Sequence, residues 1–147
     1  MSISFIGSTL GLVASTPATE DESGYGALTT VVVGKVVSIS ELGDTSEDIT
    51  WTLLAEGRVN HLNGGKDLGN ISVVVEYDRS DAGLALLEAG NNTNTNHSFL
   101  ITDTDGDKYY FQGIIADLIT SARDASTYKG MTFTMRGNTA ITKVDGP

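Results

Sequence analysis

The sequence predicts a mainly β fold of the α+β class, an antiparallel β-sandwich or barrel with one short α-helix packed on it and long loops. Three observations lead to this prediction. Several short segments alternate apolar and polar residues, as strands with one buried face do. The 147 residues include 17 glycines but only 2 prolines, a balance typical of chains with many hairpins. One segment alone has helical spacing. The length suits a single domain over residues 1–147.

Strands are expected where side chains alternate or where aromatic and β-branched residues are concentrated. Four segments meet these criteria: residues 49–53, 71–77, 108–116 and 131–136. Trp51 and Tyr77 occupy apolar positions of this alternation. We therefore expect both side chains to pack in the interior and not to stack on a ligand.

A hairpin is expected at the acidic segment Asp103-Thr-Asp-Gly-Asp107. An Asp-Gly pair tolerates positive φ at both central positions of a tight turn. Three carboxylates within five residues also resemble a calcium-binding loop. Such a loop would need a glycine and a bidentate glutamate where this chain has Lys108 and Ile114. The hairpin is therefore favoured, and no metal is expected.

One helix of about ten residues is expected after Tyr77. Asp78 or Ser80 can cap its N-terminus, and two leucines three residues apart share one of its faces. Gly90 lies where a left-handed residue would end the helix. Two long polar segments, residues 16–26 and 54–70, are expected to be loops; the first lacks periodicity, and the second has weak strand character only around residues 58–62. Loops of that length are usually functional or mobile.

The net charge of −10 comes from 19 acidic and 9 basic residues. A protein that binds DNA or an anionic membrane tightly needs a basic surface, and this composition has too few basic residues to form one easily. The charge can reflect solubility alone, or a surface that must not bind a polyanion. Composition does not decide between these two interpretations.

The sequence offers no catalytic constellation, so we expect neither an enzyme nor a cofactor. The absence of cysteine excludes thiolate metal sites and cysteine nucleophiles, and the two histidines lie outside any ligand-spaced cluster. Gly64-Gly65-Lys66 lacks the frame of a phosphate loop, because Asp67 follows the lysine. The N-terminal segment carries no Lys or Arg and is interrupted by glycines, so neither a signal peptide nor membrane insertion of this chain is expected.

The order of features from Val31 to Ile141 resembles the major tail tube proteins of long-tailed phages with non-contractile, lambda-like tails. A strand, an acidic turn and a second strand run through VVGKVVSISELGDTSEDITWTLL. The segment NHLNGGKDLGNISVVVEYD follows, with a glycine-x-aspartate-x-glycine approach at residues 65–69. A short helix, a Phe-x-Ile strand, an Asp-Gly hairpin and the Phe-x-Gly of residues 111–113 complete the order. The chain departs from the family in holding Arg79-Ser80 where a proline often opens the helix.

The resemblance implies a structural subunit, without a C-terminal immunoglobulin-like domain, that forms hexameric rings stacked into a hollow tube. The tube would belong to a virion tail assembled in the host cytoplasm. Genomic DNA would pass through its acidic lumen without tight binding, which like charge favours. The partners implied are further copies of this chain, the tape measure protein, the tail terminator and the tail-tip proteins.

The resemblance also implies which segments make contacts. The long inter-subunit loop over residues 54–70 supplies Glu56, Arg58, Asn60, His61, Asn63, Lys66 and Asp67. The N-terminal arm and loop over residues 1–26 supply Glu20, Asp21, Glu22 and Tyr25. Candidates for the acidic lumen are Glu41, Asp44, Glu47 and Asp48.

Two alternatives remain open from the sequence. The first alternative is the tube subunit of a contractile tail or of a type VI secretion system, which would also assemble into stacked rings. The second alternative is a β-sandwich module that binds carbohydrate or a receptor. Such modules usually display clustered aromatic residues, whereas aromatic residues make up only 7% of this chain.

Overall fold

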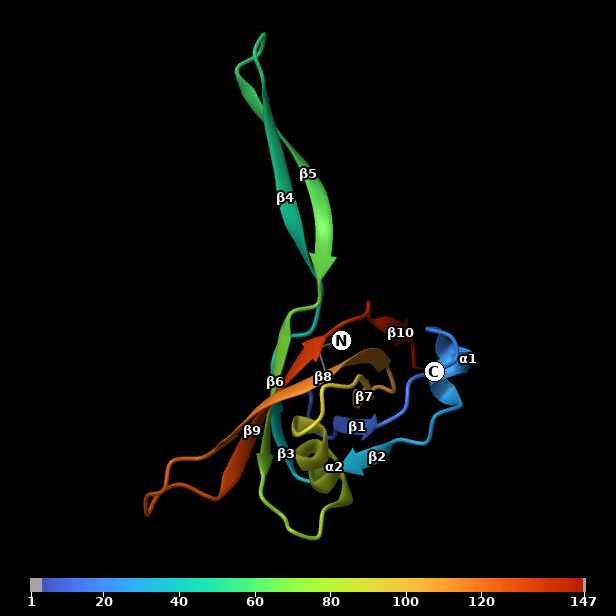
Figure 1. Cartoon of the computed structure of the whole chain (residues 1–147), viewed down its shortest axis with the longest axis vertical. Helices are drawn as coiled ribbons and strands as arrows, with labels where there is room; N and C mark the ends of the chain where they lie inside the picture. Colours follow the sequence, from blue (N-terminus) through green and yellow to red (C-terminus); the bar gives the residue numbers. More distant parts are fainter. Residues whose placement is uncertain (1–3, 147) are drawn as a thin grey trace.

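Two antiparallel sheets, an eight-stranded sheet and a two-stranded hairpin, make up most of the computed structural model, which describes residues 4–146 (Figure 1). The eight-stranded sheet forms a rounded body, and the hairpin projects far from it (Figure 1). The elements of the described residues are β1 (Thr9–Val13), α1 (Glu22–Gly26), β2 (Val31–Val33), β3 (Val36–Ile39), β4 (Thr45–Leu53), β5 (Arg58–Asp67), β6 (Asn70–Glu76), α2 (Ala82–Asn91), β7 (His97–Thr102), β8 (Lys108–Thr120), β9 (Gly130–Gly137) and β10 (Thr142–Val144). The predicted mainly β fold is confirmed.

The body sheet wraps around until its two ends meet. Its strand order is β2-β1-β7-β8-β9-β6-β3, with β10 paired to β8. The terminal strands β2 and β3 are consecutive in the chain and are separated only by Gly34 and Lys35. The wall is thus closed by a short connection instead of a hydrogen-bonded ladder, which places the body between a sandwich and a barrel.

Strand β8 connects the two halves of this wall. Residues 108–113 pair with β7, and residues 113–120 pair with β9. The ladder to β9 is interrupted between Ala116 and Leu118, where Asp117 has a φ of 45°. A bulge of this kind bends a strand and increases its twist, so β8 can pass from one half of the wall to the other.

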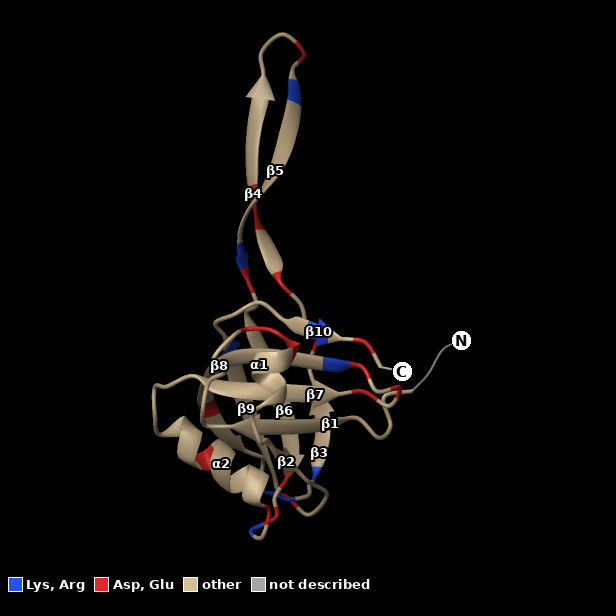
Figure 2. Cartoon of the chain, turned by 90° about the vertical axis from the view of Figure 1, so that its right-hand side faces the viewer, with Lys and Arg blue, Asp and Glu red and all other residues tan. Residues whose placement is uncertain are grey.

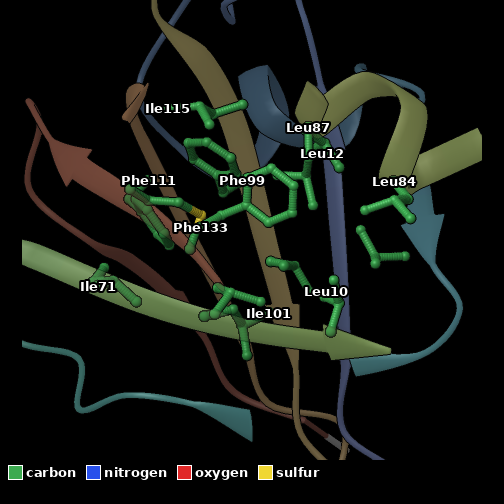
Figure 3. Close-up of a cluster of buried hydrophobic side chains, with 14 of the residues drawn as sticks. Leu10, Leu12, Ile71, Leu84, Leu87, Phe99, Ile101, Phe111, Ile115 and Phe133 are labelled. Carbon is green, nitrogen blue, oxygen red and sulfur yellow. The ribbon is translucent and has the colours of Figure 1, made fainter. Parts of the chain in front are cut away.

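The core lies between the two halves and contains the apolar residues of the alternation predicted for residues 71–77 and 131–136 (Figure 3). Phe99, Phe111 and Phe133 are fully buried, and the rings of Phe99 and Phe111 stack with centroids 5.2 Å apart. Burying a side chain of this size contributes roughly 1.5–3 kcal/mol. Leu10 and Ile71 approach the same cluster from β1 and β6 (Figure 3).

Helix α2 closes one side of the body and confirms the predicted helix with two corrections. Asp81 caps it, accepting a hydrogen bond from the Gly83 amide at 3.0 Å, whereas Asp78 or Ser80 was expected. The helix continues through Gly90 to Asn91. Gly90 is needed for packing, because a Cβ there would lie 2.5 Å from the Ile115 Cδ1 atom.

The structure has a second helix that the sequence pattern does not predict. Helix α1 lies in the segment 16–26 that was expected to be a loop, and five residues are too few to show a helical period. Asp21 caps it by accepting from the Gly24 amide at 2.8 Å. Its Tyr25 is buried and stacks on Tyr110 with ring centroids 5.0 Å apart. Tertiary packing therefore fixes this helix.

The predicted Asp-Gly hairpin connects β7 and β8. The Gly106 amide donates to the Asp103 carbonyl at 3.0 Å, and Gly106 has a φ of +94°. Tyr77 is partly buried against the core, as expected. No helix among residues 4–146 has both the length and the apolar character needed to cross a membrane.

Candidate assembly surface

The long hairpin formed by β4 and β5 is the main feature outside the body (Figure 1). Its strands pair from Thr45 opposite Asp67 to Leu53 opposite Arg58. The expectation of a loop over residues 54–70 is therefore wrong, because only residues 54–57 form a turn and β5 follows directly. The sequence of β5 shows no clear alternation because neither of its faces is buried in the chain.

One face of the long hairpin is apolar and exposed. Ile49, Trp51 and Leu53 lie on the same face of β4, and Leu62 is paired with Ile49 across the ladder. These four side chains are 41–57% exposed. The expectation that Trp51 packs in the interior is wrong within this chain, because β4 projects away from the core. An apolar face of this kind typically marks an interaction surface.

The opposite face of the long hairpin is mostly polar, although Val59, paired with Thr52, is 50% exposed on it. Thr50 and Thr52 lie on it, with His61 opposite Thr50. The His61 Nδ1 atom lies 3.1 Å from the Asp48 carboxylate. Both side chains are more than 60% exposed, so this pair contributes little to stability. Most of the large apolar side chains are thus gathered on one face, which they share with Asn60 and Arg58 opposite Trp51 and Leu53.

The root of the long hairpin is anchored through Leu68. This side chain is 7% exposed and belongs to the core cluster. Gly137 makes room for it, since a Cβ at that position would lie 2.2 Å from a Leu68 methyl group. Gly69 adopts a φ of +75°, and its amide donates to the Asp67 carboxylate at 2.8 Å. The tight turn at the root therefore sets where the hairpin leaves the body.

The hairpin end of the molecule is acidic. Residues 41–69 hold six carboxylates against Arg58 and Lys66, a net charge of −4 (Figure 2). Of the lumen candidates, Glu41 and Asp44 lie on the segment that leads to the hairpin, and Glu47 and Asp48 lie in β4. Their place in a lumen stays a prediction.

Two longer edges of the body sheet are unpaired within the described residues, besides the outer edge of the three-residue strand β10. Strand β3 pairs only with β6, and residues 114–120 of β8 pair only with β9. Each edge carries an exposed β-branched residue, Val37 at 57% and Ile119 at 61%. The edge of β2 is different, because α2 lies against it and a Cβ on Gly83 would lie 2.7 Å from the Val32 carbonyl. Unpaired edges can accept strands of another chain.

The N-terminal candidates are placed around α1. Glu20 accepts a hydrogen bond from the buried Gln112 side chain at 3.4 Å, and Asp21 caps the helix. The pKa of Asp21 lies below its ordinary value because the Gly24 amide and the Thr19 hydroxyl donate to it. Glu22 is exposed, whereas Tyr25 packs inside the chain. A role of the exposed members in subunit contacts stays a prediction.

The candidates from β5 and its turn all lie on the long hairpin: Glu56 in the turn, and Arg58, Asn60, His61, Asn63, Lys66 and Asp67 in the strand. Sequence reasoning missed the apolar face formed by β4 and Leu62. Its signal was present as the alternation of residues 49–53, which was assigned to the core. Among residues 4–146, no cluster of three or more potential metal ligands is present.

Comparisons with known proteins bear on the fold. No family model matches the sequence, and no curated protein matches it significantly. A chain of the anti-feeding prophage baseplate, solved with 6-fold symmetry, superimposes with a TM-score of 0.71 at 10% identity, covering 99% of this chain and 96% of that one. A chain from the tail of an empty gene transfer agent particle, with C6 symmetry, gives 0.69 at 11% identity, covering 97% and 99%.

A third likeness is to a chain of the PVC sheath-tube complex, an extracellular contractile injection system in its extended state. It gives a TM-score of 0.59 at 12% identity, covering 92% of this chain and 88% of that one. This chain shares the fold of these tail and baseplate chains. The expected tail-tube type is therefore confirmed at the level of the fold.

Proposed function

We propose that this chain is the structural subunit of a phage-like tail tube, built from rings that stack into a hollow conduit. The observation that carries the proposal is the long hairpin with its exposed apolar face. A two-stranded hairpin is marginally stable alone, and an apolar face left in water adds a further cost. A neighbouring copy that covers this face removes both problems. The hairpin is therefore a contact element between subunits.

The unpaired edges support lateral association. The edges of β3 and β8 belong to the same four strands β3-β6-β9-β8 and lie at opposite margins. Contacts between two different surfaces of identical subunits close into rings when the rotation permits. Two of the similar structures were solved with six-fold symmetry, which supports hexameric rings.

The remaining features of the proposal concern the conduit. A net charge of −10 supports a lumen through which DNA passes without tight binding. Glu41, Asp44, Glu47 and Asp48 are the proposed acidic lining. The tape measure protein, the tail terminator and the tail-tip proteins are the proposed partners, in a virion tail assembled in the host cytoplasm. A structural role of this kind needs no catalytic activity.

The type of tail separates two versions of the proposal. The sequence resemblance favours a non-contractile, lambda-like tail, whereas the likeness to the PVC sheath-tube complex supports a contractile one at least equally. A contractile tail needs a tube whose outer surface binds a sheath. Co-purification of the assembled tube with sheath subunits encoded beside it would favour the contractile version. Tubes that carry no sheath would favour the non-contractile version.

Negative-stain electron microscopy of the purified full chain at increasing concentration tests the function. Hollow tubes with six-fold end views are expected, and monodisperse monomers under all conditions would contradict the proposal. Paired residues such as Thr45 and Asp67 have Cα atoms about 5 Å apart, so an Asn-Gly turn can replace residues 46–66. That variant should keep the thermal stability of the body and form no tubes. W51S is the matched point variant and should act in the same direction.

A further inference from the structure

We infer that the tip of the long hairpin docks into a hollow at the far end of a second copy of this chain, with Leu54 against Tyr128 and Glu56 facing Arg123. This inference rests on the proposed function and names the surface that receives the hairpin. The two regions lie at opposite ends of the long axis of the molecule (Figure 1). A contact between opposite ends repeats from copy to copy without closing on itself, as a stacked tube requires.

The tip is closed by two backbone hydrogen bonds and leaves an apolar side chain uncovered. The amides of Glu56 and Gly57 both donate to the Leu53 carbonyl, at 3.3 and 2.8 Å, and Gly57 adopts a φ of +62°. These bonds hold the turn in one shape, while Leu54 is 100% exposed. Leu54 directly follows Leu53 and is the first residue of the turn that ends the hairpin. Since β4 has nine residues, the tip stands about 30 Å from the root.

The hollow is formed by the loop between β8 and β9 and is held open by its own hydrogen bonds. The Ser121 hydroxyl donates to the Tyr128 carbonyl at 2.9 Å and accepts from the Gly130 amide at 3.0 Å. Asp124 accepts from the Ser126 amide at 2.9 Å and from the Thr127 hydroxyl at 2.7 Å. Arg123, Tyr128 and Lys129 are among the residues that line the hollow.

The apolar surface of the hollow suits Leu54. Tyr128 is 49% exposed, and its ring lies so close to Gly130 that a Cβ there would be 2.7 Å from the Tyr128 Cε2 atom. The ring is thereby kept beside the hollow. A leucine that covers this ring would remove apolar surface of both side chains from water.

Charge complementarity selects a second copy of this chain as the occupant. Arg123 is exposed and takes part in none of the ion pairs formed among residues 4–146. Lys129 adds a second cation, held 4.1 Å above the Tyr77 ring. Asp124 is the only carboxylate of the loop, and its internal hydrogen bonds lower its pKa. At the tip, Glu56 is the only charged residue of the turn over residues 54–57, and Arg58 follows at the start of β5. The contact proposed for Arg123 is therefore with Glu56 alone.

A charge-swap experiment on the full chain tests this contact. E56K and R123E should each raise the concentration needed for tubes about tenfold or more, as expected when a close ion pair across an interface is broken. The double variant E56K/R123E should recover most of that loss. D105K and R79E make the same changes in charge outside the contact and should assemble like the wild type. Equal assembly of all variants, or a double variant no better than the singles, would overturn the inference.

Disulfide trapping gives an independent readout that does not depend on tube length. The chain contains no cysteine, so every bridge in the double variant L54C/Y128C joins engineered thiols, and the single variants L54C and Y128C report bridges between like positions. The two positions are too far apart within one copy, and oxidation of assembled protein should therefore give a ladder of covalent oligomers. L54C/A89C, with the second thiol on the exposed side of α2, should give none. Wild-type tubes without the ladder would overturn the docking alone, whereas a wild type that forms no tubes would overturn the proposed function itself.

Discussion

The body and the long hairpin contain the same local pattern with opposite outcomes. Phe133 in β9 and Trp51 in β4 each lie between two threonines. Phe133 is 0% exposed, whereas Trp51 is 44% exposed. In both places the pattern forms a strand with one apolar face. The difference lies in what covers that face: the body folds a second half of its sheet over Phe133, whereas nothing among residues 4–146 covers the face of Trp51.

The largest difference between the two regions should appear in stability. F133A removes a fully buried ring and should lower the free energy of unfolding by about 3–5 kcal/mol. W51A should lower that of the monomer by less than about 1 kcal/mol, because its side chain already contacts water. Urea unfolding of both variants under non-assembling conditions measures this. Similar losses would mean that Trp51 is buried in the free monomer.

In assembly, Trp51 should matter more than Phe133, the reverse of their expected effects on stability. W51S removes the largest side chain of the exposed apolar face, so it should abolish tubes or raise their critical concentration about tenfold or more. T52S, on the polar face, is the matched control and should assemble normally. Sedimentation and negative-stain microscopy report the polymer fraction. Normal tubes from W51S would show that this face is not a subunit contact.

The junction between the two regions should give an intermediate effect. G137A places a methyl group against Leu68, which anchors the root of the hairpin, and should cost about 1–3 kcal/mol through overpacking. G65A meets nothing within 4 Å and should be nearly neutral. Thermal unfolding of both variants checks the pair. A neutral G137A would mean that the root of the hairpin moves freely relative to the body.

The smallest expected effect is a change in thermal stability when Asp103 or Asp124, each in a turn of the body, loses its charge. Burial, followed by the charge of Asp105, raises the pKa of Asp103, so its ionised form is disfavoured in the fold. D103N should therefore raise the Tm by about 2 °C at neutral pH, and the gain should shrink as the pH falls through the raised pKa.

D124N should instead lower the Tm at neutral pH. Hydrogen bonds from Thr127 and Ser126 lower the pKa of Asp124, so the stability that its ionised form contributes is present above its ordinary pKa and is lost as the pH falls through the lowered pKa. Equal pH profiles for both variants would contradict this assignment.

The sequence predicted strands with a regular apolar alternation, whether or not the alternating face is buried, and missed elements without a periodic pattern. Alternation located β6 and β9 because their apolar residues meet a core, and the Asp-Gly pair located the turn between β7 and β8. Strand β5 was expected to be a loop because it is held by backbone pairing with β4 and not by burial of one face. Its side chains therefore need not alternate between apolar and polar. Helix α1 was missed because Tyr25 is held by Tyr110, a contact between residues far apart in the chain. The candidate residues of 54–70 were placed in a contact segment, but the apolar face beside them was assigned to the core.

The sequence by itself determined several of the strands, where the tight turn near residue 105 lies and how acidic the molecule is. These properties depend on neighbouring residues or on composition. Only the tertiary structure decided which apolar faces are covered, because burial depends on what the rest of the chain can reach. Leu68 and the turn at Gly69 direct β4 and β5 away from the core, and no segment of the described chain follows them. The same alternation therefore stabilises the body in β9 and forms a candidate subunit contact in β4.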